Sequence, residues 1–412
     1  MTDNLHDILS ERGFIAQATE TSLRERLQTP LSAYIGFDPT ADSLHVGSLV
    51  PIMGLYWLQQ CGHRPLVLVG GGTGLVGDPS GKTEMRKMLT REDIDGNARS
   101  IAAQIGGVVR FDTSPTGAKL INNADWLARL NWIDLLREVG PCFSVNRMLT
   151  MDSVKNRLES GGITFLEFNY MVMQAYDFLH LHRTEGCTLQ MGGQDQWGNI
   201  VMGIELVRRL ADVPVAGLTF PLVTKSDGGK FGKSEKGNIW LSRERTPVYE
   251  FFQFWRNAAD ADVRRFLGFF TLLPMGEVDR LTSAGGEGLN RAKEVLAYEA
   301  TKLIHGKDEA DRALEDAKRA FGAQHDVTGD SIPHAALAAA ELESGLGVLA
   351  LLVRAGLAQS NGEARRLVQA GGVRVHDRGI EDPNHKLTTA DLVNGYLLLR
   401  AGKKRLFRFD VA

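Results

Sequence analysis

Residues 34–48 read YIGFDPTADSLHVGS and connect two apolar stretches, residues 31–37 and 48–61. The first stretch has the length and composition of a buried parallel strand, and the second is long enough for a helix. His45 therefore lies where a helix should begin, beside backbone N–H groups that have no partner within the helix. Such groups bind anions, so the sequence predicts a strand-turn-helix unit with an anion site at the start of its helix.

The first half of the chain continues this alternation of strands and helices. Residues 65–69 form another short apolar run, and a second helix is expected at residues 91–106. Alternating strands and helices predict an α/β fold with a doubly wound parallel sheet. In such sheets the ligand binds at the carboxyl ends of the strands, which is where His45 is expected.

A second segment, residues 226–237, carries positive charge in a context rich in Gly, Ser and Asp. It contains Lys230, Lys233 and Ser234, and its glycines favour a flexible loop. Most segments of this composition are solvated charged loops. Together with fixed donors at a helix start, however, two ammonium groups on a loop can close on a triphosphate and stabilise its charge.

Residues 165–181 are apolar on almost every side, so a helix at this position must be buried. Tyr170, Gln174 and Asp177 nevertheless recur at helical spacing on one stripe. Burying an unpaired amide costs roughly 2–7 kcal/mol, so these side chains must have partners. An internal hydrogen-bond network and the polar wall of a substrate pocket both satisfy this requirement, and the spacing alone does not separate them.

Residues 72–77 read GTGLVG, which has the form of a dinucleotide-binding turn with Asp95 as the candidate ribose ligand. The context argues against this assignment. Residues 78–81 read DPSG and interrupt the helix that such a loop must start. We therefore interpret the segment as a glycine-rich turn and expect no tightly bound nucleotide cofactor.

The chain has 412 residues, a size for two or three domains, with 43% hydrophobic and 24% charged residues. Its apolar runs are too short to cross a bilayer, and its first 13 residues lack the pattern of a signal peptide. Three scattered cysteines, Cys61, Cys142 and Cys187, indicate neither a disulfide framework nor a zinc site. We expect a cytoplasmic protein without a membrane partner or a resident metal.

The second half changes to helices from residue 246, including runs at 289–305 and 307–321. Residues 323–345 have the texture of a linker, with a short helical piece at 335–340. The last module, 346–412, combines a capped helix near residue 364 with strand-like segments at 373–375, 396–400 and 405–411.

The same last module is basic. Residues 346–412 contain 11 Lys/Arg and 6 Asp/Glu, a charge of +5 that leaves −8 for the rest of the chain. This imbalance fits a polyanionic partner, and it also fits a solvated charged surface.

The segments around His45 and Lys230 resemble the two signature motifs of class I aminoacyl-tRNA synthetases. The surrounding sequence is similar to the bacterial tyrosyl-tRNA synthetase family over nearly the whole chain, and residues 346–412 resemble the alpha-L RNA-binding motif. The resemblance implies a Rossmann-like catalytic domain at 1–242, a helical anticodon-side domain at 243–322, a linker at 323–345 and a small α+β RNA-binding domain at 346–412.

The resemblance also implies which residues form the site. The residues expected to bind tyrosine are Tyr34, Asp78, Tyr170, Gln174, Asp177 and Gln196. Those expected to bind ATP are Gly36, Asp38, Thr40, His45, Ser48, Gly193, Asp195, Lys230, Lys233 and Ser234. Those expected to act in catalysis are Thr40, His45, Lys82, Arg86, Lys230 and Lys233. The chain departs from the commonest family pattern at Ile35, at Ser48, where His or Asn is frequent, and at Phe231-Gly232 of the second motif.

The implied reaction has two steps: ATP activates L-tyrosine to tyrosyl-adenylate with release of pyrophosphate, and the tyrosyl group then passes to the 3′-terminal adenosine of tRNA(Tyr). Mg²⁺ would accompany ATP, and the family implies a homodimer with residues 131–151 and the segment before Tyr170 at its interface. A tryptophanyl ligase would share the architecture, but the basic tail and the pair of Tyr34 and Asp177 argue against it. A non-catalytic RNA-binding paralogue would need damaged motifs, and these are intact.

Overall fold

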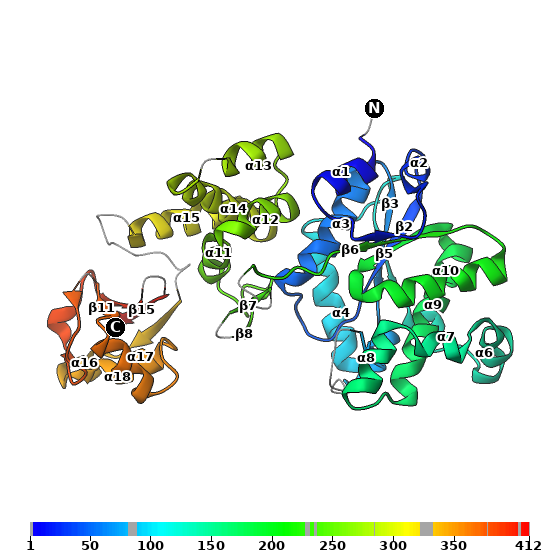
Figure 1. The fold of residues 1–412 in the computed structure, drawn as a ribbon. Coiled ribbons are helices and arrows are strands. Elements are labelled where there is room, and N and C mark those ends of the chain that lie inside the picture. Colours follow the sequence, from blue (N-terminus) through cyan, green and yellow to red (C-terminus); the bar gives the residue numbers. More distant parts are fainter. Residues whose placement is uncertain are drawn as a thin grey trace. The chain divides into compact units, whose positions relative to one another are not determined.

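The computed structural model describes residues 3–80, 89–226, 231–234, 237–283, 285–321, 333–376, 378–402 and 405–411. The chain forms two compact units (Figure 1). The first unit comprises Met1–Ser242 and Ala258–Ala292, and the second comprises Arg243–Asn257 and Lys293–Ala412. Residues 258–292, which were expected in the helical domain, therefore pack with the first unit.

The first unit is built on a six-stranded sheet with the order β1-β6-β5-β2-β3-β4. All neighbouring pairs are parallel except β1 with β6. The strands are β1 (Gln17–Ala18), β2 (Ser32–Phe37), β3 (Arg64–Val69), β4 (Lys119–Asn122), β5 (Cys187–Gly193) and β6 (Ala216–Phe220). The strands predicted up to residue 37 and at 65–69 are confirmed as β2 and β3. From β2 the chain adds β3 and β4 on one side, and it then adds β5 and β6 on the other side of β2. Doubly wound sheets open a crevice at this switch point, which here lies between β2 and β5.

Helices cover both faces of this sheet. Figure 1 shows α3 (Leu49–Gln60) and α4 (Arg91–Gly106) on one side and α9 (Phe165–Glu185) and α10 (Trp197–Ala211) on the other. The predicted helices near 48–61, 91–106 and 165–181 are thereby confirmed. The other helices of this unit are α1 (Leu5–Glu11), α2 (Leu23–Arg26), α5 (Ala124–Leu127), α6 (Trp132–Glu138), α7 (Val145–Leu149), α8 (Asp152–Ser160), α12 (Val263–Phe270) and α13 (Met275–Thr282).

Local sequence determines where α9 begins and ends. Thr164 and Glu167 form a capping box at its start, in which each side chain accepts a hydrogen bond from the other residue's backbone N–H. Gly186 ends the helix in the left-handed region, at φ +63°, which glycine adopts without steric cost. These two signals fix the first and last residues of α9, and with them the position of its polar stripe along the helix.

The second unit begins with α11 (Val248–Arg256), continues with α14 (Glu287–His305) from residue 293 and α15 (Lys307–Phe321), and ends in a small α+β domain. That domain has a five-stranded sheet in the order β12-β11-β14-β15-β9. Its elements are β9 (His334–Leu337), α16 (Ala339–Glu343), β10 (Leu346–Gly347), α17 (Val348–Arg354), α18 (Asn361–Gln369), β11 (Val373–Val375), β12 (Arg378–Gly379), β13 (Lys386–Leu387), β14 (Tyr396–Ala401) and β15 (Arg405–Val411).

The prediction of a short helix at 335–340 is wrong. Residues 334–337 form β9, which pairs in parallel with β15 from Arg408 to Val411. A strand partner that is distant in the sequence overrides the helix propensity of the alanines here. The folded C-terminal domain therefore includes residues 334–345, which were expected in the linker.

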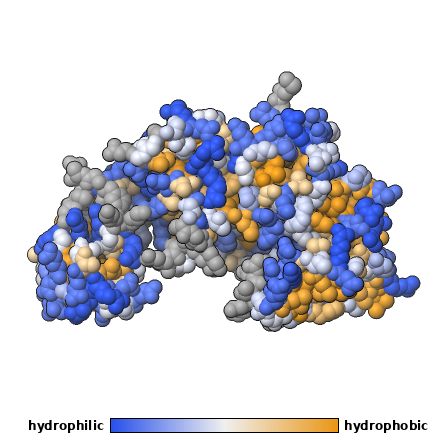
Figure 2. Space-filling view, in the orientation of Figure 1, coloured by the Kyte–Doolittle hydropathy of each residue, from blue (hydrophilic) through white to orange (hydrophobic). Residues whose placement is uncertain are grey.

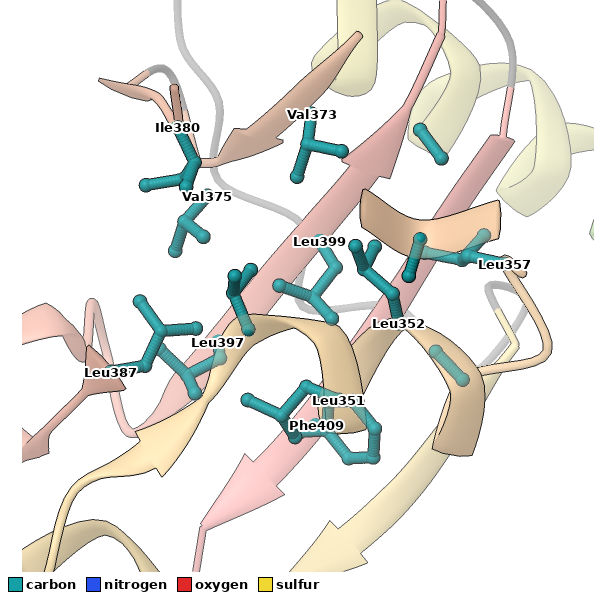
Figure 3. Close-up of a cluster of buried hydrophobic side chains, with 14 of the residues drawn as sticks. Leu351, Leu352, Leu357, Val373, Val375, Ile380, Leu387, Leu397, Leu399 and Phe409 are labelled. Carbon is teal, nitrogen blue, oxygen red and sulfur yellow. The ribbon is translucent and has the colours of Figure 1, made fainter. Parts of the chain in front are cut away.

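The C-terminal domain has an apolar core of its own. Figure 3 shows Leu351 and Leu352 of α17 pointing toward Leu397, Leu399 and Phe409 of the sheet. All buried members of this cluster come from residues 337–409. Among the described residues of the whole chain, no helix has the combined length and apolarity that crossing a membrane requires.

Candidate active site

A cavity of about 680 Å³ opens at the carboxyl ends of β2 and β5 in the first unit. It lies at the crevice that the strand order predicts. Thirteen of the predicted site residues line this cavity: Tyr34, Gly36, Asp38, Thr40, His45, Ser48, Asp78, Tyr170, Gln174, Asp177, Gly193, Asp195 and Gln196. Lys82, Arg86 and Lys230 lie outside the described residues. Lys233 and Ser234 form β7 (Lys233–Ser234), of which only the backbone is described.

His45 stands directly before the short helical turn Val46–Ser48, which leads into α3. Its Nδ1 accepts a hydrogen bond from the Gly47 N–H at 3.0 Å. A Cβ atom at position 47 would lie 2.7 Å from the imidazole ring, so only glycine allows the ring to fold over the turn. The histidine is thus held at the start of a helix, as the sequence predicts, on the wall of the cavity.

The structure brings the two sequence motifs together. The Val46 N–H donates to the Ile239 carbonyl at 3.0 Å, and the Leu241 N–H donates to the Leu44 carbonyl at 2.8 Å. The backbone after the second motif therefore runs beside the turn that carries His45, and β7 pairs with β8 (Gly237–Asn238) in the same region. Two segments almost 200 residues apart in the sequence form one side of the cavity.

A chain of polar side chains crosses the floor of the cavity. The Tyr170 hydroxyl donates to Asp38 Oδ2 at 2.9 Å, and the Thr73 hydroxyl donates to Asp38 Oδ1 at 2.8 Å. A Cβ atom at Gly70 would lie 2.0 Å from Asp38 Oδ1, which leaves no space there for a side chain. Glycine at position 70 therefore permits this arrangement of Asp38.

A second group of polar side chains contains Asp78 and Gln196. Gln196 Nε2 donates to Asp78 Oδ2 at 2.6 Å and to Asp195 Oδ2 at 3.2 Å. The Ser80 N–H donates to Asp78 Oδ1 at 2.9 Å. Asn199 donates to both Gln174 Oε1 and Gln196 Oε1, at 3.0 and 3.1 Å. The carboxylates of this group are thus oriented by hydrogen bonds from a backbone N–H and a side-chain amide.

Asp177 lies at the buried end of the cavity, where it is 1% exposed. Asn123 Nδ2 donates to one of its carboxylate oxygens at 2.9 Å and Trp126 Nε1 to the other at 2.8 Å. Burial raises the pKa of Asp177 to about 8, although both hydrogen bonds oppose that shift. The polar stripe of α9 therefore satisfies both interpretations of its spacing, since its residues line a pocket and belong to a hydrogen-bond network.

Tyr34 lies beside Asp177 and is equally buried, at 1% exposed. Its hydroxyl has no hydrogen-bond partner among the described residues. Burial raises the pKa of Tyr34 well above its usual range, and the neighbouring Asp177 adds to this shift. A buried hydroxyl without a partner is costly, so this end of the cavity fits a ligand that supplies a polar group.

Sequence reasoning missed several residues that build the site. Asn123 and Thr73 line the cavity and hold Asp177 and Asp38, and Trp126 and Asn199 complete the network. One signal was available for Asn123, because it follows β4 directly and the carboxyl ends of parallel strands carry ligand-binding residues. Trp126 gave no such signal, since an isolated tryptophan more often belongs to the core.

Two family models match this chain and together cover most of it. The model of tRNA synthetases class I (W and Y) matches residues 25–322. The model of the tyrosine–tRNA ligase SYY-like C-terminal domain matches residues 327–409.

Individual proteins show the same likeness. The tyrosine–tRNA ligase of Rhizobium meliloti (strain 1021) is 50% identical over 408 residues, which cover 98% of this chain and 97% of that protein. The tyrosine–tRNA ligase of Desulfatibacillum aliphaticivorans is 50% identical over 427 residues, covering 99% of each. The structure of a C-terminally truncated mitochondrial tyrosyl-tRNA synthetase of Aspergillus nidulans superimposes with a TM-score of 0.70 at 32% identity, covering 77% of this chain and 94% of that one. A tryptophanyl-tRNA synthetase of Plasmodium falciparum shares the fold at 12% identity, with a TM-score of 0.54 over 75% of this chain and 86% of that one.

Proposed function

This chain belongs to the tyrosine–tRNA ligases of the class I tRNA synthetases, and from that premise we propose how its residues divide the work of the reaction. In the first step the tyrosine carboxylate attacks the α-phosphorus of ATP, and pyrophosphate leaves. In the second step a terminal ribose hydroxyl of tRNA accepts the tyrosyl group. Neither step needs a protein nucleophile, so the rate depends on positioning and on charge stabilisation.

The observation that carries the substrate assignment is the pair of Tyr34 and Asp177 at the buried end of the cavity. We propose that the substrate phenol hydroxyl binds there, where it forms a hydrogen bond with the carboxyl group of Asp177 and meets the unpartnered Tyr34 hydroxyl. Tyr170, Gln174 and Asp78 would bind the substrate ammonium group, and Gln196 would bind its carboxylate. Asp78 is suited to a cation because a backbone N–H and an amide already orient it.

The ATP end of the cavity lies where the two motifs meet. We propose that Thr40 and His45 act on the phosphates from fixed positions and that Lys82, Arg86, Lys230 and Lys233 act from neighbouring segments. Gly36, Asp38, Ser48, Gly193, Asp195 and Ser234 would contact the rest of the nucleotide. Mg²⁺ would arrive with ATP and neutralise phosphate charge.

ATP–pyrophosphate exchange with each of the twenty amino acids in turn tests this assignment. We expect exchange with tyrosine, without any need for tRNA, and almost none with phenylalanine or tryptophan. Exchange driven by tryptophan would support a tryptophanyl ligase instead. A complete lack of exchange, with tRNA binding intact, would support a non-catalytic RNA-binding protein.

The tRNA is the proposed partner of the basic C-terminal domain. Its described surface exposes Arg365 and Arg366 on α18 and Arg374 on β11, and such groups bind phosphate backbone. The basic turn expected at residues 403–404 lies outside the described residues. A cytoplasmic location is part of the proposal, and the three free cysteines are consistent with a reducing compartment.

We also propose that two copies of the chain associate through the region of α6 to α9. Apolar side chains there are unusually exposed, and Figure 2 shows apolar surface over this part of the first unit. Phe165 is 71% exposed, Ile133 59% and Trp132 48%, and the rings of Trp132 and Phe165 contact each other with centroids 6.4 Å apart. Val145, Leu149, Leu158 and Leu166 extend the same surface. Exposed apolar patches of this kind mark interaction sites.

Sedimentation equilibrium tests this association. We expect a dimer for the natural chain and a monomer for Phe165→Asp, because an unpaired charge at the centre of an apolar interface is strongly unfavourable. Leu272→Asp is the matched control, since Leu272 is exposed at 40% but lies outside this surface. A monomer for the natural chain, or a dimer that survives Phe165→Asp, would contradict the proposal.

A further inference from the structure

We propose that Phe231 and Gly232 are positioning residues, which determine where the two adjacent lysines of the second motif stand relative to His45. The inference rests on the proposed function, in which Lys230 and Lys233 act on the triphosphate. Phe231 and Gly232 are also the positions at which the motif departs from its commonest form. Phe231 makes ring contacts that need an aromatic side chain, and Gly232 has a backbone conformation that favours glycine.

Phe231 packs on α12. Its ring is parallel to that of Phe270, with an interplanar angle of 4° and centroids 5.5 Å apart. It also meets the ring of Phe266, with centroids 5.1 Å apart and an angle of 58°. Phe266 and Phe270 are buried, at 3% and 0% exposed. Offset stacked and tilted rings at these distances attract one another, so Phe231 is seated in a defined aromatic site.

The support beneath Phe231 is rigid because α12 is tied to the rest of the first unit at both ends. At its C-terminal end the buried Arg12 donates to the carbonyl oxygens of Gly268, Thr271 and Leu273, at 3.0, 3.1 and 2.6 Å. The same guanidinium lies 4.1 Å from the centroid of the Trp57 ring in α3. Because α3 follows the turn that carries His45, the aromatic site and the histidine belong to one framework.

At the other end of α12, Asp262 holds the chain before the second motif. Asp262 Oδ2 accepts from the Ser226 N–H at 2.9 Å and from the Ser226 hydroxyl at 3.0 Å. Arg265 forms an ion pair with Asp262 at 2.7 Å. Ser226 and Phe231, the described residues on either side of positions 227–230, therefore contact α12 or the residue that precedes it.

Gly232 packs on the turn that carries His45. Its φ is +77°, a conformation that costs a residue with a side chain much more than it costs glycine. A Cβ atom at this position would lie 3.0 Å from Val46 Cγ2. The Gly232 carbonyl also accepts from the Ile239 N–H at 2.8 Å. Glycine thus lets the backbone next to Lys233 approach the turn closely.

These contacts limit where the lysines can be. Lys230 precedes Phe231 and Lys233 follows Gly232 in the chain, so each lysine is one residue from an anchored position. Misplacing a charged group by about 1 Å can cost about 100-fold in rate. Loss of either anchor should therefore slow adenylate formation, while tyrosine, which binds at the other end of the cavity, should keep its affinity.

The test compares Phe231→Ala and Gly232→Ala with the natural chain. Single-turnover formation of tyrosyl-adenylate should slow about 10- to 100-fold in each, while the Kd for tyrosine in equilibrium dialysis stays within about twofold. Phe231→Tyr, which keeps the ring, should retain most of the rate. Phe111→Ala and Gly62→Ala are the matched controls. Gly62 has a φ of +86° with open space around it, so its substitution imposes the same backbone strain away from the cavity.

A mutant cycle in a background that carries both Lys230→Ala and Lys233→Ala decides whether Phe231 acts through the lysines. We expect Phe231→Ala to add less than about a twofold loss in that background. A full additional loss there, or a lost tyrosine affinity in Phe231→Ala, would overturn the inference. If Lys233→Ala alone leaves the rate unchanged, the assignment of Lys233 to the phosphates fails instead, and the inference fails with it.

Discussion

Replacing Asp177 by alanine should reduce kcat/KM for tyrosine in ATP–pyrophosphate exchange by about 1,000-fold or more. The substitution removes the proposed hydrogen-bond partner of the substrate hydroxyl. It also leaves two buried donors, Asn123 Nδ2 and Trp126 Nε1, without the carboxylate to which they donate. The same logic predicts strong rejection of phenylalanine by the natural chain, because phenylalanine leaves Asp177 and Tyr34 unmatched. Tyrosyl enzymes are themselves the measured example of this effect, and the magnitude of about 10⁵ is theirs rather than a result of this geometry.

Two comparisons separate recognition from stability in this experiment. Asp316→Ala removes a buried aspartate of α15, at 3% exposed and outside the cavity, and should lower the melting temperature without raising KM for tyrosine. Phenylalanine-dependent exchange of Asp177→Ala should not fall below that of the natural chain. An unchanged kcat/KM for tyrosine in a folded Asp177→Ala protein would remove Asp177 from the pocket.

Truncation after residue 329 should leave ATP–pyrophosphate exchange within about twofold of the full chain, while tyrosyl transfer to tRNA should fall by about 100-fold or more. The cavity lies entirely in the first unit, whereas the C-terminal domain buries an apolar cluster drawn from residues 337–409. Removing that domain should therefore spare activation. It would also remove the +5 of charge on residues 346–412, and the salt dependence of tRNA binding should flatten accordingly.

A substitution that keeps the domain folded provides the control for the truncation. Arg365→Ala with Arg366→Ala removes two exposed cations of α18, and should weaken tRNA binding and reduce its salt slope by about two. Arg280→Ala, at an exposed arginine of α13, should change neither. If the truncated chain charges tRNA as well as the full chain at moderate salt, the C-terminal domain is not the tRNA-binding element and its charge is a solvated surface.

The sequence predicted regular elements where local signals and burial agree. The strand ending at Phe37 and the helix starting at Phe165 are largely apolar and have clear ends, and both are confirmed. Residues 334–337 form a strand where a helix was predicted. An alanine-rich stretch has no local feature that reveals a parallel partner more than 70 residues away. Strand pairing depends on such partners more than helix formation does.

The residues of the candidate site likewise separate into those that local motifs predict and those that only the fold reveals. Motifs predicted thirteen of the residues that line the cavity, since a phosphate site needs backbone donors and cations that short segments can supply. Spacing left open whether Asp177 lines a pocket or belongs to an internal network, and the fold shows that it lines the cavity and also accepts hydrogen bonds from Asn123 and Trp126. The sequence could not predict the role of Trp126, because its hydrogen bond to Asp177 depends on how α5 packs beside α9.

The sequence by itself determined the fold class, the family and the residue types of the site, because strand and helix periods, glycine turns and charged motifs are local properties of the chain. Only the tertiary structure decided which of these residues share a surface. The contact of Gly232 with Val46 and the stacking of Phe231 on Phe270 join segments that no local pattern connects. The physical reason is that these contacts depend on how the whole first unit packs. The positive φ of Gly232 and its close approach to Val46 require the two motifs to lie side by side. The stacking of Phe231 requires α12, which Arg12 near the N-terminus holds in place.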